Sequence, residues 1–201
     1  MILHTIGHST RSSDELIALL RANGIQLLAD IRRFPGSKRY PHFASEAMAN
    51  WLPENGIAYL HMPELGGRRK VLADSRNTFW RNEQFRAYAD YMASDEFRAA
   101  IDKLVSLTGI GRRESGIGDE RTAFRPPTPD TRSPTPLAIM CAEAVPWRCH
   151  RNLVADELTR RGIEVLHIIG PEVPKRHVMN PHAEIEGDHL VYPAEQQTLR
   201  L

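Results

Sequence analysis

The chain has 201 residues, of which 41% are hydrophobic and 25% charged, and its formal net charge is +1 at pH 7. These values are typical of a soluble protein with one hydrophobic core, and they exclude a chain dominated by one sign of charge, so that any basic site must be local. The sequence contains two cysteines, lacks a basic N-terminal leader, and has no apolar run near the ~20 residues of a membrane span. We therefore expect a cytoplasmic protein with reduced thiols and no membrane partner.

The first half of the chain alternates short apolar runs with amphipathic stretches. Residues 2–8 predict a strand, 12–24 a helix with a serine cap and an Asn-Gly stop, and 25–35 a strand ended by Pro-Gly. A helix near 45–54 and a short strand at 56–62 follow. Apolar residues at helical spacing then predict two further helical segments between Asn82 and Leu107.

Residues 108–136 have a different composition, rich in Gly, Pro, Ser, Thr and Arg with hardly an apolar side chain. Such a segment cannot bury enough surface to offset its ordering entropy. We expect it to be a flexible insertion loop within one domain that spans residues 1–201.

The strand–helix alternation resumes after this segment. Residues 137–141 predict a buried strand, 149–162 a helix ended by a glycine, and 163–169 another strand. Strands that alternate with helices form a mostly parallel sheet with helices on both faces. The fold class predicted is therefore a single three-layer α/β domain with a Rossmann-like or rhodanese-like layout.

Reactive side chains follow nearly every predicted strand. They are His8 and Ser9, Asp30 and Arg32, His61, Cys141 and Glu143, and His167. Ligands of such folds bind outside the carboxyl ends of the strands, so together these residues predict a binding site. Taken singly, each also has an ordinary structural explanation, such as an ion pair for Asp30 or a core position for a histidine.

Both cysteines lie in one short segment, CAEAVPWRCHR, at residues 141–151. A helix that begins at Cys149, with arginines on either side, would lower the pKa of this thiol and could also hold an anion. Glu143 could act as a general base. On a helix, Cys149 and His150 would point about 100° apart, which disfavours a shared metal. We therefore predict no cofactor, and a divalent metal stays an alternative.

These residues favour a hydrolase or transferase that acts on an anionic, phosphate- or nucleotide-like substrate, without the glycine fingerprint of a nicotinamide enzyme. Candidate catalytic residues are Glu143, Cys141, Cys149 and Asp30. Candidate substrate-binding residues are His8, Ser9, Arg32, His61, His150, Arg151 and His167.

Three alternatives stay open, and the oligomeric state is not predicted. The segment RRFPGSKRYPHF at 32–43 mixes cations with aromatic residues, as in proteins that bind nucleic acid. The Asp-x-Arg strand end and the cysteine loop also resemble rhodanese-like sulfurtransferases in layout, although this loop lacks their small, glycine-rich character. The Cys/His set could instead form a metal-binding module.

Five short motifs occur in a fixed order: TIGHST, DIRRFPGS, YPHF, YLHMPELGG and MCAEAVPWRCHRNLVADEL. On these motifs the chain resembles the domain of unknown function 488 family of bacterial proteins, from Ile2 to about Ile169. The resemblance implies a small cytoplasmic α/β domain and no particular reaction. The motif residues are Gly7, His8, Ser9, Asp30, Arg32, Pro35, Ser37, Leu65, Gly66, Gly67, Cys141, Glu143, Cys149, His150, Arg151 and His167.

Overall fold

A computed structural model describes residues 1–36, 39–109 and 135–194 of the chain. A six-stranded sheet with the strand order β3-β2-β4-β1-β5-β6 forms its centre. The strands are β1 (Ile2–Gly7), β2 (Leu27–Asp30), β3 (Ala58–His61), β4 (Leu137–Cys141), β5 (Glu164–Ile168) and β6 (Lys175–Arg176). The first five run parallel and β6 pairs antiparallel with β5, which confirms the predicted mostly parallel sheet.

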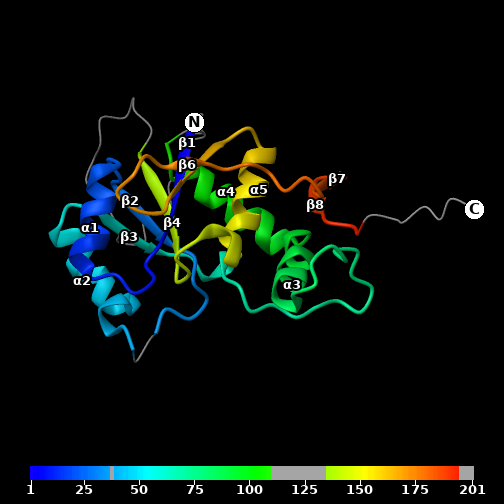
Figure 1. Cartoon of the computed structure of the whole chain (residues 1–201), viewed down its shortest axis with the longest axis horizontal. Helices are drawn as coiled ribbons and strands as arrows, with labels where there is room; N and C mark the ends of the chain where they lie inside the picture. The colour runs from blue at the N-terminus through cyan, green and yellow to red at the C-terminus, as the bar shows by residue number, and fades with distance from the viewer. Residues whose placement is uncertain (37–38, 110–134, 195–201) are drawn as a thin grey trace, which may run out of the picture.

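Helices cover both faces of this sheet, as predicted (Figure 1). On one side lie α1 (Ser13–Ala22) and α2 (Ser45–Glu54), and on the other α3 (Glu83–Met92), α4 (Asp95–Ser106) and α5 (Arg151–Arg160). Side chains alternate along a strand, so each strand serves two cores. In β4, Met140 packs with the α1 and α2 core, whereas Ile139 and Cys141 pack with the core of the other three helices.

Local sequence signals account for the helix ends. Ser12 accepts a hydrogen bond from the backbone N–H of Glu15, whose carboxylate accepts one from the backbone N–H of Ser12, so α1 begins with a capping box. The prediction of a helix from Cys149 is wrong by two residues. Cys149 is extended, with φ −140° and ψ 144°, and follows a short 3-10 turn at Pro146–Arg148. The N–H of Cys149 is therefore bonded to the carbonyl of Pro146, and α5 begins only at Arg151.

The predicted insertion loop at 108–136 lies almost entirely outside the described residues. Its two ends are adjacent, because the N–H of Thr135 donates to the carbonyl oxygen of Thr108 at 3.1 Å. The C-terminal part adds a hairpin of β7 (Glu184–Glu186) and β8 (His189–Val191). Over the described ranges, no helix combines the length and apolar character needed to cross a membrane.

Candidate functional site

A cavity of about 260 Å³ opens where the carboxyl end of β4 meets the segments that follow β2 and β3. We call it the arginine-rich cavity. Five of the predicted site residues line it: Arg32, Cys141, Glu143, Cys149 and His150. The cavity therefore lies at the carboxyl end of the sheet, where ligands of open α/β folds bind.

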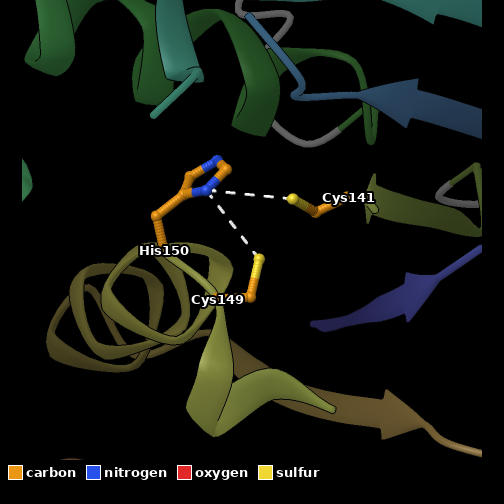
Figure 2. A group of neighbouring side chains, drawn as sticks. All are labelled: Cys141, Cys149 and His150. Atoms are coloured by element: carbon orange, nitrogen blue, oxygen red, sulfur yellow. Dashed lines mark hydrogen bonds between the residues drawn. The ribbon is translucent and has the colours of Figure 1, made fainter. Parts of the chain in front are cut away.

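Cys141, Cys149 and His150 converge in this cavity. Figure 2 shows both sulfur atoms facing the same ring nitrogen of His150. Each Sγ lies 3.8 Å from Nδ1 of that ring, and the three atoms lie within 4.8 Å of one another. The expectation that Cys149 and His150 point apart is wrong, because the extended backbone at Cys149 replaces the helical offset.

The two thiols differ in acidity, and not in the predicted sense. A hydrogen bond from Cys149, together with the charges of His150 and Arg151, holds the pKa of Cys141 well below its usual value, although burial opposes this. Burial raises the pKa of Cys149, and so does the neighbouring Cys141 sulfur. The predicted lowering of the Cys149 pKa is therefore wrong, and Cys141 is the more acidic of the two thiols.

Arg151 lies behind the cysteine segment and not among the residues that line the cavity. Only 1% of its surface is exposed, and its guanidinium donates to the carbonyl oxygens of Glu143 and Ala144. Gly7 lies against the same peptide group, since a Cβ added there would come within 1.7 Å of the Glu143 carbonyl oxygen. Arg151 thus fixes the shape of this segment, whereas the sequence predicted that it would contact substrate.

Asp30 is buried on the opposite face of the sheet. Its carboxylate accepts hydrogen bonds from Nε and Nη2 of Arg32 at 2.8 and 2.6 Å, and from the hydroxyl of Tyr59 at 2.9 Å. Nη1 of Arg32 lies 3.0 Å from Nε2 of His8. Asp30 and His8 are thus engaged in an internal network, and neither lines the cavity.

Three more predicted residues also lie outside the cavity lining. Ring nitrogen Nε2 of His61 donates to the carbonyl oxygen of Arg32 at 2.8 Å. Ser9 adopts a left-handed φ of 51° and its N–H donates to the carbonyl of Ala142. His167 joins a buried chain in which Nε2 lies 3.0 Å from Nδ1 of His177, which in turn contacts Asp156 at 2.8 Å.

The buried histidines make stability depend on pH. Burial, and then the charge of Arg32, lowers the pKa of His8 to about 4, while burial, and then His177, lowers that of His167 to about 3. The unfolded chain binds these protons near pH 6.5 and the native protein does not, so stability is complete above about pH 6.5 and is lost as pH falls. We expect the free energy of unfolding to fall between pH 6.5 and 5.5 by at most ~1.4 kcal/mol per histidine. Urea unfolding at both pH values measures this, and an equal or higher stability at pH 5.5 would contradict it.

Several cavity residues were not among the candidate catalytic and substrate-binding residues, although two of them, Arg33 and Phe34, belong to the predicted nucleic-acid-binding segment at 32–43. They are Arg33, Phe34, Arg68 and Arg148 at the rim, with Gln84 and Phe85 from the first turn of α3. Arg68 adopts a φ of +60°, which is uncommon for a residue other than glycine and tends to occur at functional sites. Arg68 directly follows the two glycines that end the motif YLHMPELGG, but nothing in the sequence indicated that α3 would reach this edge of the sheet.

Residues 12–111 match the model of the family described as "Domain of unknown function DUF488". This segment of the chain therefore belongs to the DUF488 family, as the three motifs inside it, at 30–37, 40–43 and 59–67, indicated. The matched residues include three arginines of the cavity lining, Arg32, Arg33 and Arg68, while the cysteine segment at 141–151 lies beyond the match. No curated protein and no solved structure matched the chain.

Proposed function

We propose that the protein is a hydrolase or transferase that acts on an anionic, phosphate-bearing substrate bound in the arginine-rich cavity. The charge distribution of the lining carries this proposal. Arg33, Arg68 and Arg148 border the cavity, and within the described ranges none of the three forms an ion pair with a carboxylate. Glu143 is the acidic residue of the lining. Arginine clusters of this kind bind phosphate through charge-assisted hydrogen bonds.

The backbone of the cysteine segment supports the same conclusion. The carbonyl oxygens of Cys141 and Ala142 accept hydrogen bonds from the N–H groups of His8 and Ser9, and Arg151 holds the next two. In a trans peptide the N–H points opposite to the C=O. The amides of residues 142–145 therefore face away from β1 and Arg151, and two of these residues line the cavity. Successive amides that face one way form a cradle for an anion.

The same cavity is lined by side chains that could take part in the reaction. Cys141, Cys149 and His150 supply two sulfur atoms and an imidazole, and the exposed carboxylate of Glu143 can accept or return a proton. Asp30, the other carboxylate among the predicted catalytic residues, already accepts hydrogen bonds from Arg32 and Tyr59. We therefore assign acid–base chemistry to Glu143.

Replacing Arg148 by Gln tests anion binding. The wild-type protein should be stabilised against heat by pyrophosphate or a nucleotide, by about 2.7 kcal/mol at a hundredfold excess over the dissociation constant. Loss of a charged donor worth about 1.5–3 kcal/mol should weaken binding roughly tenfold or more. Arg81→Gln, an exposed arginine outside the lining, is the matched control. Equal stabilisation of both variants would show that the anion does not bind in the arginine-rich cavity.

Phe34 indicates a nucleotide-like substrate. Its side chain is 64% exposed at the cavity rim, with the guanidiniums of Arg33 and Arg68 5.9 and 5.8 Å from its ring centre. An exposed ring beside cations stacks bases and contributes about 1–3 kcal/mol per base. Phe34→Ala should therefore weaken nucleotide binding by that amount and leave pyrophosphate binding unchanged. Ile185→Ala, at an equally exposed apolar residue in β7, serves as control.

The same ring supports a second candidate, a nucleic-acid strand as the ligand. Arg39 lies 5.5 Å from the ring of Tyr40, a second cation beside an aromatic residue in the segment that follows β2. Two residues of the predicted nucleic-acid-binding segment at 32–43, Ser37 and Lys38, lie outside the described residues. Binding of a short oligonucleotide that is tighter than a mononucleotide and falls steeply with salt would favour this candidate. Equal affinity for both would favour the small-molecule enzyme.

A further inference from the structure

We propose that Cys141, Cys149 and His150 bind a zinc ion through Sγ, Sγ and Nδ1, with the fourth coordination position open to the arginine-rich cavity. The site would be the reacting centre of the proposed enzyme, so its catalytic role rests on that function, whereas its existence does not. The ligand set of two thiolates and one imidazole is one that zinc uses in catalytic sites with an open position.

The positions of the three ligand atoms fit the ion. Zinc lies about 2.3 Å from sulfur and about 2.1 Å from nitrogen, which places neighbouring tetrahedral ligands roughly 3.5–3.8 Å apart. Nδ1 of His150 is 3.8 Å from each sulfur, and all three atoms lie within 4.8 Å of one another. Small side-chain movements would therefore complete the geometry.

The backbone directs these atoms to one point. Cys141 ends β4 on the face covered by α5, and the extended conformation of Cys149 turns its sulfur toward the imidazole that follows it. Gly67 packs beside the ring, since a Cβ at this position would come within 3.2 Å of Nδ1. The ring of Tyr88 lies 4.9 Å from it. The imidazole is thus held in place by its surroundings and leaves Nδ1 facing the two sulfurs.

The hydrogen bonding of His150 also indicates a missing partner. Nδ1 faces the two sulfur atoms at 3.8 Å and, within the described ranges, forms no shorter hydrogen bond, whereas the buried Nε2 lacks a partner whether or not a metal binds Nδ1. Buried polar groups without strong hydrogen bonds are costly. A metal bond at Nδ1 would give that nitrogen a strong partner, and the ion would also offset the charge of the two buried sulfur atoms once both bind it as thiolates.

The open coordination position would allow the zinc ion to take part in the reaction. Zinc lowers the pKa of a bound water and polarises a phosphoryl oxygen. The water would give its proton to Glu143, its oxygen would form the new P–O bond, and the ester P–O bond would break. The leaving oxygen would then take the proton from Glu143. Hydrolysis of a phosphate ester balances in this way without any redox partner.

Metal analysis of the full chain, purified with a thiol reductant, tests the site. We expect about one zinc per chain, and a thiolate-to-cobalt absorption band when Co²⁺ replaces it. Cys141→Ala, Cys149→Ala and His150→Ala should each lower the affinity about tenfold or more. His189→Ala, a histidine of β8, should change nothing. Circular dichroism of each variant shows whether it folds, and the cobalt band in the wild-type protein does not depend on that result.

Three results would overturn the zinc site. One is a protein that takes up neither zinc nor cobalt, and another is full metal binding by all three variants. The third is rapid iodoacetamide labelling of Cys141 that added zinc leaves unchanged, which would instead make Cys141 a free nucleophile. Anion stabilisation that depends on Arg148 in a metal-free protein would keep the proposed function while removing the metal. Metal binding without any stabilisation by anions would keep the zinc site and remove the proposed function.

Discussion

Asp30→Ala should lower the free energy of unfolding by about 3–5 kcal/mol, the cost of leaving one member of a buried ion pair unpaired. The carboxylate of Asp30 is inaccessible to solvent, and the side chain of Arg32 is 8% exposed. Two guanidinium nitrogens, one backbone N–H and the Tyr59 hydroxyl donate to this carboxylate. Without it the Arg32 guanidinium keeps the Phe43 carbonyl and His8 as partners and loses its counter-charge.

Chemical denaturation of two variants isolates this effect. Arg76→Ala breaks an exposed ion pair with Glu186 and should cost no more than about 1 kcal/mol. The double variant Asp30→Ala with Arg32→Met removes both charges and should recover part of the loss. A loss below about 1 kcal/mol for Asp30→Ala alone would show that water or another group compensates the arginine.

The period of the apolar residues was sufficient to predict the layers of the fold. The runs at 137–141 and 163–169 became β4 and β5, and a serine caps the start of α1 as expected. Such signals are local, because one strand or one helix end contains all the groups that make them. A cavity at this edge was expected from topology, since parallel strands bring their carboxyl ends to one edge.

The division of the predicted site into two faces did not follow from the same argument. Asp30 pairs in register with Met140, and Cys141 is the next residue along β4, so strand alternation sends the two side chains to opposite cores. The extended conformation of Cys149 could not be predicted from the sequence either. It depends on a 3-10 turn at Pro146 and on Arg151, which turns inward to hold carbonyl oxygens seven and eight residues earlier.

Gly7→Ala should destabilise the protein by about 3 kcal/mol or more and abolish binding in the arginine-rich cavity. The added Cβ would lie 1.7 Å from the carbonyl oxygen of Glu143 and 2.8 Å from Nη1 of Arg151. That oxygen belongs to the backbone and is itself bonded to Arg151, so no side-chain rotation relieves the clash. The cysteine segment must move away from β1, and the sulfur of Cys141 and the amides after it move with it.

Gly170→Ala is the matched control, because a Cβ there meets no atom within 4 Å and should change stability by less than about 1 kcal/mol. Thermal unfolding gives the stability of both variants, and pyrophosphate-induced stabilisation reports on the cavity. The two readouts separate two causes, since a folded Gly7→Ala protein that no longer binds anions has lost the segment's shape and not its fold. Full anion binding by Gly7→Ala would mean that the segment's backbone takes no part in the site, and the arginine rim alone would then have to hold the substrate.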